Sequence, residues 1–260
     1  MNSSYTEQYE IHQGDALEFL RDLPAYSVDF FVTDPPYSSG GAFRDDRAKP
    51  TGDKYALTGT EKQYANFGGD CRDQLSFYYW CALWYGQALR VMKPGTIACV
   101  FTDWRQLPVT INAMQIGGLV WRGIMPWNKS EAARPARGRF RAQCEYIVWA
   151  SAGQITERTQ ACLPGFFTYP VVGKDKLHQT GKPLELMVDI LKIVGSAPVT
   201  VCDPFMGSGT TGAAALMLGH RFWGCEINAE IFAIAEKRLQ ETANKQHLFD
   251  YKIGIEYGQN

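Results

Sequence analysis

The chain has 260 residues and a net charge of −1, so it can form a full α/β domain and carries no overall charge attracting a polyanion. No apolar run approaches membrane-spanning length, and the N-terminus lacks the basic and then apolar pattern of a secretory signal. The seven cysteines are scattered singly, without a Cys-x-x-Cys pair or a ligand-spaced histidine cluster. We therefore expect a cytoplasmic protein with reduced thiols, no metal site, and any nucleic-acid surface confined to a local patch.

The first predicted helix follows the segment His12-Gln13-Gly14-Asp15. Leu17, Leu20 and Leu23 have the spacing that places apolar residues on one helical face. Asp15 has the residue type of an N-cap, and this structural role alone accounts for it. The alternative is functional, with the Asp15 carboxylate at the rim of a ligand cleft.

Residues 28–32 form a short apolar run with aromatic and β-branched side chains, which predicts a buried strand. The run leads into Thr33-Asp34-Pro35-Pro36-Tyr37, at the strand end where open parallel sheets bind ligands. Each proline removes a backbone N–H, and the residue before each proline is pushed towards extended geometry. The resulting stiff turn presents carbonyl oxygens, which suits a site that accepts hydrogen bonds from an amino group. The alternative is an ordinary proline-rich turn after a strand.

A polar stretch, residues 38–70, comes next and contains Arg44, Arg47 and Lys49. It is too long for an idle connection in a compact domain, and such segments are usually lids, binding loops or disordered chain. We then expect a helix over 77–89, a turn at 93–95, a strand over 96–101, a helix that ends at 117–118, and strands over 119–127 and 145–150.

Four arginines fall within eight residues of the region 128–177: Arg134, Arg137, Arg139 and Arg141. Pro135 and Gly138 oppose regular structure there, and no acidic residue interrupts the run. This pattern fits contacts with nucleic-acid phosphates, although a solvated charged face has the same composition.

The C-terminal part begins with a predicted helix from Lys182-Pro183 to about residue 194. A strand over 199–202 leads into a glycine-rich turn, an alanine-rich helix and a strand over 222–226, and Asn228 can cap a last helix that ends near residue 241. The alternation of strands and helices predicts one α/β domain with a doubly wound, mostly parallel sheet.

The glycine-rich turn, the helix after it and Glu226, which lies 23 residues beyond Asp203, have the arrangement of a nucleotide-type site. No lysine follows Gly209, which excludes a phosphate-binding P-loop, and the glycine spacing departs from the dinucleotide pattern. Asp203 would repel a phosphate but suits an ammonium group. These features favour S-adenosyl-L-methionine, which carries an ammonium, a sulfonium and a ribose but no phosphate.

The early Asp-Pro-Pro-Tyr turn at 34–37, combined with the late Asp-Pro-Phe-Met-Gly-Ser-Gly-Thr-Thr segment at 203–211, resembles the DNA amino-methyltransferases of the β group. In that family the catalytic motif precedes the cofactor motif. The resemblance extends through Gly14-Asp15, Lys93-Pro94-Gly95, residues 178–183 and residues 224–226. It implies one methyltransferase domain over 1–260, with the S-adenosylmethionine-dependent methyltransferase fold in circularly permuted motif order and recognition inserts at about 38–70 and 128–177.

The resemblance also assigns roles to residues. Catalysis falls to Asp34, Pro35, Pro36 and Tyr37. Asp15 would accept from the cofactor's adenine amino group and Glu226 from its ribose, and the full predicted cofactor set is Asp15, Asp34, Thr180, Lys182, Asp203, Pro204, Phe205, Gly207, Ser208, Gly209, Thr210, Glu226 and Ile227. The predicted DNA contacts are Arg44, Arg47, Lys49, Arg134, Arg137, Arg139 and Arg141.

Thr180 and Lys182 are assigned from a His-x-Thr-x-Lys-Pro pattern, in which Gln179 and Gly181 depart from the residues often found in the family. Lys182 could neutralise the methionine carboxylate of the cofactor. A solvated lysine at the start of a helix is the alternative.

The expected reaction is methyl transfer to the N6 amino group of adenine in double-stranded DNA after base flipping, in a restriction–modification setting, because the Asp-first motif accompanies adenine more often than cytosine. The alternatives are cytosine N4, the same chemistry on RNA or a protein glutamine, and a non-catalytic cofactor-binding or DNA-binding module. The glycine spacing disfavours a nucleotide-dependent oxidoreductase. A homodimer would suit a palindromic target.

Overall fold

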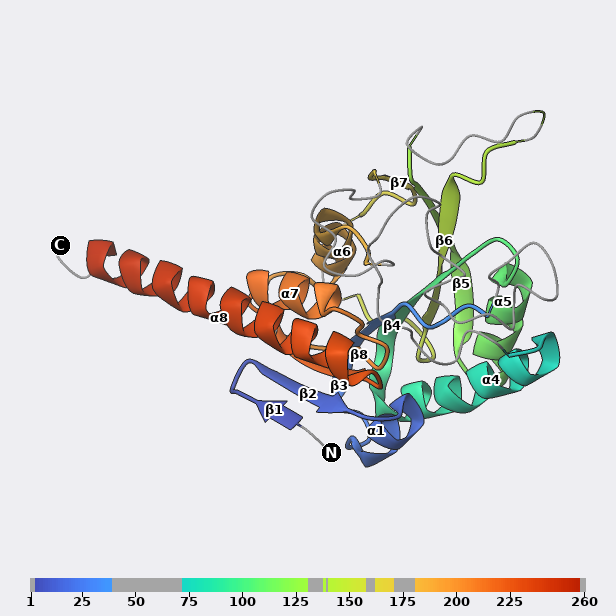
Figure 1. Ribbon diagram of the computed structural model, residues 1–260, viewed down its shortest axis with the longest axis horizontal. Helices are drawn as coiled ribbons and strands as arrows, with labels where there is room; N and C mark the ends of the chain where they lie inside the picture. Colours follow the sequence, from blue (N-terminus) through green and yellow to red (C-terminus); the bar gives the residue numbers. More distant parts are fainter. Residues whose placement is uncertain are drawn as a thin grey trace.

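The structure is a computed structural model that describes residues 3–38, 72–130, 138, 140–157, 162–170 and 181–257, with side chains described as far as residue 245. Within these residues the chain forms one large sheet with helices on both faces (Figure 1). No helix in the described ranges is both long enough and apolar enough to cross a bilayer.

The sheet is mostly parallel, as expected. Its neighbouring strands are, in spatial order, β1 (Ser3–Tyr5), β2 (Tyr9–Gln13), β9 (Arg221–Glu226), β8 (Thr200–Asp203), β3 (Val28–Thr33), β4 (Met92–Thr102), β6 (Cys144–Ser151), β5 (Val120–Asn128) and β7 (Phe167–Thr168). Strands β2, β9, β8, β3 and β4 run parallel, whereas β6 is antiparallel to both β4 and β5.

The helices divide into two layers, each with its own core. The layer on one face contains α1 (Ala16–Asp22), α4 (Gln74–Val91) and α5 (Leu107–Ile116). The other face carries α6 (Leu184–Leu191), the short 3₁₀ helix η1 (Lys192–Val194), α7 (Thr210–Met217) and α8 (Ala229–Tyr257) (Figure 1). On β3 the neighbouring residues Phe30 and Phe31 point into opposite cores, so this strand is covered on both faces.

A buried carboxylate fastens β3 to both of its neighbours. Lys93 Nζ lies 2.8 and 2.9 Å from the two oxygens of Asp29, and the Thr200 backbone N–H donates to Oδ2 at 3.1 Å. Lys93 lies where the register between β3 and β4 shifts, because Val28 pairs with Met92 whereas Phe30 pairs with Ile97. The turn predicted at 93–95 is therefore an irregularity inside β4 and not a break before it.

Other boundaries also differ from the sequence expectations. The edge strand β1 and its neighbour β2 were not predicted, because β1 has only three residues and β2 is a short strand that runs directly into the Asp15 turn. Helix α8 continues to Tyr257, well beyond the expected end near residue 241. The two predicted caps are confirmed, since Asp15 accepts from the Leu17 N–H at 2.8 Å and Asn228 accepts from the Glu230 N–H at 2.9 Å.

His220 should make the stability of the protein sensitive to acid. Its side chain is buried, and neither ring nitrogen has a hydrogen-bond partner among the described residues, so burial lowers its pKa. The unfolded chain then binds more protons than the native state as the pH falls below about 6.5. The free energy of unfolding is therefore unaffected by His220 above that pH. Below it, this free energy falls by at most about 1.4 kcal/mol per pH unit for one proton.

Urea unfolding of the wild type and the His220→Leu variant at pH 7.5 and pH 5.5 tests this effect. The variant should lose less stability between the two pH values than the wild type does. Equal losses in the two proteins would contradict the prediction.

Candidate active site

The two sequence motifs meet at the middle of the sheet. Strands β3 and β8 are neighbours, with Phe30 opposite Val201 and Phe31 opposite Cys202. Just beyond these pairs, the Thr33 hydroxyl donates to Asp203 Oδ1 at 2.5 Å, across 170 residues of sequence. The chain leaves β8 towards β9 on one side, while β3 and β4 lie on the other, so this is the switch point where open α/β sheets bind ligands.

Asp203 organises the turn that follows it. The carboxylate is buried and accepts three hydrogen bonds: from Thr33, from the Phe205 backbone N–H at 3.0 Å, and from the Thr211 hydroxyl at 2.6 Å. Burial raises the pKa of Asp203 to about 7, although these hydrogen bonds oppose the rise. A cation beside this carboxylate would favour its charged form.

The glycine-rich turn uses glycine where a side chain would be strained. Gly207 and Gly209 have φ angles of +52° and +78°. A Cβ on Gly207 would meet nothing within 4 Å, so the turn is open at that point, whereas a Cβ on Gly209 would lie 3.2 Å from Ala235 Cβ. Gly209 precedes α7, whose N-terminal N–H groups provide a positive pole.

The other predicted residues of this turn are mostly turned into the protein. Pro204, Ser208 and Thr210 are buried, and the Thr210 hydroxyl accepts from Arg238 at 2.5 Å. The half-buried ring of Phe205 packs edge-on against Trp80 and Trp84 of α4, with both centroid distances 5.4 Å. Phe205 therefore ties the turn to the helix layer on the opposite side of the sheet from α7.

The predicted adenosine contacts lie on the same edge, at the ends of β9 and β2. The Gly14 N–H donates to the Glu226 carbonyl at 3.1 Å, which joins the two strand ends. The Glu226 carboxylate accepts from the Asn228 N–H at 2.8 Å, and its burial raises its pKa. Asp15 uses Oδ1 to cap α1, and Ile227 is exposed.

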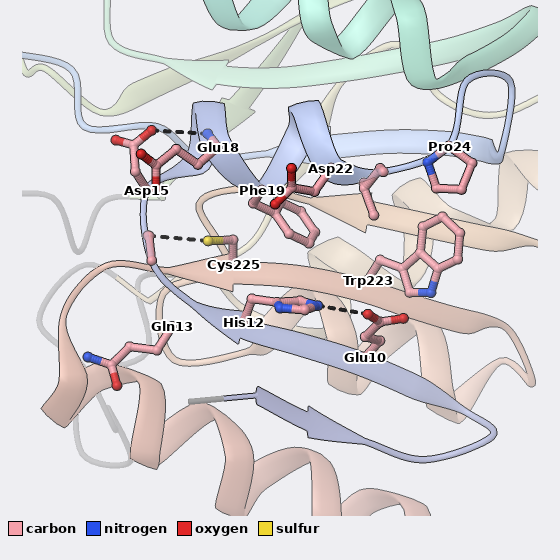
Figure 2. Close-up of a pocket in the computed structure, with 12 residues that line it drawn as sticks. Glu10, His12, Gln13, Asp15, Glu18, Phe19, Asp22, Pro24, Trp223 and Cys225 are labelled. Atoms are coloured by element: carbon pink, nitrogen blue, oxygen red, sulfur yellow. Dashed lines mark hydrogen bonds and ion pairs between the residues drawn. The ribbon is translucent and has the colours of Figure 1, made fainter. Parts of the chain in front are cut away.

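A groove of about 240 Å³ begins at Asp15 and continues along the α1-covered face of β2 and β9 (Figure 2). Figure 2 shows His12 paired with Glu10 inside it, with Trp223 and Pro24 at the far end. Neither Asp34 nor Asp203 lines this groove, so at most its Asp15 end belongs to the predicted cofactor site.

The Asp-Pro-Pro-Tyr turn presents a carboxylate whose two oxygens are both engaged. The Tyr37 hydroxyl donates to Asp34 Oδ1 at 2.5 Å, and Lys182 Nζ donates to Oδ2 at 2.5 Å. Burial raises the pKa of Asp34, and Lys182 opposes the rise. Pro35 is buried, while Pro36 is half-buried.

Lys182 is not the solvated helix-start lysine that the sequence allowed as an alternative. Its side chain is only 9% exposed and forms ion pairs with Asp34 and, at 3.2 Å, with Glu145 Oε2. Lys129 lies 3.2 Å from the other oxygen of Glu145. The predicted role of Lys182, neutralising the carboxylate of the cofactor, stays a prediction.

Glu145 and Lys129 were missed by the sequence analysis. Glu145 begins the predicted strand, but only the antiparallel direction of β6 brings that strand's first residues to the edge where β3 and β4 end. A single sequence contains no signal for this direction.

Several predicted contacts lie outside the described residues: Thr180, Arg44, Arg47, Lys49, Arg134, Arg137 and Arg139. Arg141 is described and half-buried. The two expected recognition inserts therefore stay predictions.

A family model described as DNA methylase, N6_N4_Mtase, matches residues 28–237. The match includes both motifs and most of the chain, so the chain belongs to this family of DNA methyltransferases. The family predicted from the sequence is thus confirmed.

Individual proteins agree with this assignment. The type II methyltransferase M.HinfI of Haemophilus influenzae is 26% identical over 262 residues, covering 89% of this chain and 68% of that protein. The crystal structure of the M1.HpyAVI–SAM complex matches with a TM-score of 0.63 and 24% identity, covering 89% of this chain and 98% of the other. The PvuII DNA methyltransferase (cytosine-N4-specific) matches with a TM-score of 0.67 and 16% identity, covering 92% and 93%. These likenesses confirm the predicted methyltransferase fold.

Replacing Thr211 with valine should destabilise the protein, because it leaves Asp203 Oδ2 buried without its hydroxyl donor. We expect a loss of about 1–3 kcal/mol in the free energy of unfolding, measured by denaturant titration. Thr242→Val is the control, since the Thr242 hydroxyl only donates to the Arg238 carbonyl of its own helix. Similar losses of unfolding free energy in the two variants would show that the hydrogen bond to Asp203 stabilises the protein no more than an ordinary one.

Proposed function

We propose that the protein is a site-specific methyltransferase that moves a methyl group from S-adenosyl-L-methionine to the N6 amino group of adenine in double-stranded DNA. The observation that carries the proposal is the Thr33–Asp203 hydrogen bond at the ends of β3 and β8. It brings a candidate amine-binding turn beside a candidate cofactor turn, as methyl transfer between two bound molecules requires.

The residues at the end of β8 fit this cofactor. Asp203 is a buried carboxylate whose pKa is raised by burial, so a nearby ammonium would stabilise its charged form. The open side of Gly207 leaves room for a ligand against the backbone. Glu226 ends β9, which lies next to β8, Ile227 follows it, and Asp15 follows β2, which supports their assignment to the adenosine half of the cofactor.

The proposed chemistry on this chain's side is mainly positioning. S-adenosylmethionine would supply a methyl group activated by its positively charged sulfur. The bond from this methyl carbon to sulfur breaks as the bond to the amino nitrogen forms, S-adenosylhomocysteine leaves, and the nitrogen releases one proton to solvent. Asp34 and the Pro35 carbonyl accept the two N–H bonds of the target amino group, which concentrates a usable lone pair on its nitrogen. Tyr37 stacks on the base, which has left the duplex at a cost of a few kcal/mol.

The choice of adenine rests on the aspartate that begins the Asp34–Tyr37 turn. Arginines 134, 137, 139 and 141, with Arg44, Arg47 and Lys49, are the proposed phosphate contacts. Cytosine N4 is the competing target, since the PvuII enzyme of similar fold is cytosine-N4-specific.

The test is incubation of the protein with methyl-labelled S-adenosylmethionine and bacterial genomic duplex DNA that lacks methylated bases. The DNA is then digested to nucleosides, which are identified by mass. We expect label in N6-methyldeoxyadenosine. Label in N4-methyldeoxycytidine would show that the target base is cytosine and not adenine. Label only in parallel samples of RNA or protein would refute a DNA substrate.

Asp34→Ala should abolish methyl transfer, because the amino group loses its anionic acceptor, while S-adenosylmethionine binding by calorimetry stays within a few-fold of the wild type. Glu241→Gln on the exposed side of α8 is a matched loss of a carboxylate charge and should retain wild-type turnover. Normal turnover in the Asp34 variant would exclude the catalytic role.

A further inference from the structure

The ammonium of Lys182 makes one of the two hydrogen bonds that the proposed function assigns to the target amino group, the one to Asp34. It donates to Asp34 Oδ2 at 2.5 Å and lies 3.2 Å from the Tyr37 hydroxyl. These are the two side chains that the proposed function assigns to the base. In the structure, therefore, a nitrogen of the protein itself donates to the Asp34 oxygen that the target amino group would use.

Aromatic rings surround the same ammonium. Its nitrogen is 5.4 Å from the ring centroid of Tyr37, 5.2 Å from that of Phe101 and 5.9 Å from that of Trp127. Cations are attracted to aromatic faces at such distances. The surroundings thus hold a positive charge in a space that is largely shielded from water.

Each oxygen of Asp34 already has one donor, and a carboxylate oxygen can accept a second. Oδ1 accepts from Tyr37 and Oδ2 from Lys182. The Asp34 side chain is only 25% exposed and the Lys182 ammonium lies against Oδ2, so a base amino group that binds there competes with Lys182. Displacing Lys182 alone would leave a buried ammonium without its closest anion. An unpaired buried charge is strongly destabilising.

Glu145 provides a second anion for the displaced lysine. Its Oε2 atom is already 3.2 Å from Lys182 Nζ and 3.4 Å from the Tyr37 hydroxyl. Lys129, at 3.2 Å from Oε1, holds the carboxylate from the opposite side. A small movement of Nζ would transfer Lys182 from Asp34 to Glu145 without losing its ion pair.

We propose that Lys182 and the target amino group compete for Asp34 and that Glu145 is the positioning residue that accepts Lys182 when the amino group binds Asp34. The proposal rests on the proposed function for the identity of the incoming amine. In this proposal Glu145 acts through Lys182 and Tyr37 and does not itself accept a hydrogen bond from the target amino group.

The first test measures how well each carboxylate retains Lys182, without using activity. Acetic anhydride modifies exposed neutral amines, and peptide mass spectrometry reports the rate at Lys182. The proteins are the wild type, Asp34→Asn, Glu145→Gln and the double variant, each checked for folding by circular dichroism. If the two anions substitute for each other, both single variants should stay within about threefold of the wild type, and the double variant should react at least about tenfold faster.

Each other pattern contradicts the proposal. Fast modification in Asp34→Asn alone means that Glu145 cannot hold the lysine, and fast modification in Glu145→Gln alone means that Asp34 cannot. Slow modification in the double variant means that packing, and not the carboxylates, retains Lys182.

The second test measures turnover with labelled cofactor and duplex DNA. Glu145→Gln should lower kcat by about tenfold or more while the KM for S-adenosylmethionine changes less than about threefold, and Glu145→Asp should recover part of the loss. Glu241→Gln is the control and should match the wild type. An unchanged kcat in Glu145→Gln, or a loss that appears only in KM, would overturn the positioning role.

The two tests separate this inference from the proposed function. Absence of methyl transfer by the wild type to any DNA refutes the function, whereas the acetylation pattern still decides whether Lys182 alternates between two anions. Wild-type transfer to DNA combined with fast acetylation in a single variant refutes the inference alone.

Discussion

The architecture of the site depends on one buried carboxylate. Asp203 receives hydrogen bonds from β3, from its own turn and from the first turn of α7, and thereby ties three separate segments to one pair of oxygen atoms. Leaving such a group without partners inside a protein costs several times the net value of an ordinary hydrogen bond. The donors therefore fix the end of β3 relative to the glycine-rich turn, and the Asp-Pro-Pro-Tyr turn begins at the next residue.

A second group of charges lies beyond this first one. Asp34 and Glu145 are negative, Lys182 and Lys129 are positive, and all four side chains are at most one-quarter exposed. Their charges balance, so the cluster can be buried without an uncompensated ion. Balance of this kind also permits exchange of partners, because a cation that lies between two anions can favour either one at little cost.

The sequence predicted those parts of the fold that depend on local chemistry. Asp15 and Asn228 could be identified as caps from residue type and position, and the aspartate–proline turn at 34–37 from the apolar strand before it. The Asp203 turn could likewise be interpreted because its glycines, its helix and Glu226 follow one another at short range. The family resemblance then joined the two motifs.

Features that depend on partners distant in sequence could not be predicted in this way. At the register shift, Lys93 forms an ion pair with Asp29 on the neighbouring strand β3, and nothing in the sequence near Lys93 identifies that partner. Glu145 reaches the site because β6 reverses direction within the sheet. Lys182 could be recognised as a conspicuous lysine, but its burial depends on the rings of Phe101 and Trp127, which arrive from two other strands.

The strand order has a consequence for biosynthesis. Strands β8 and β9 lie at the middle of the sheet, between β2 and β3, but the ribosome makes them last. Until residues 200–226 have been made, the backbone hydrogen-bonding edge of β3 has no β8 to pair with, and Phe30 lacks Val201 and Phe222 of its core. Open edges of this kind invite pairing with other chains, and contacts so distant in sequence form slowly. A chain that ends before residue 200 therefore leaves this edge unpaired, and we expect it to aggregate more readily than the full chain.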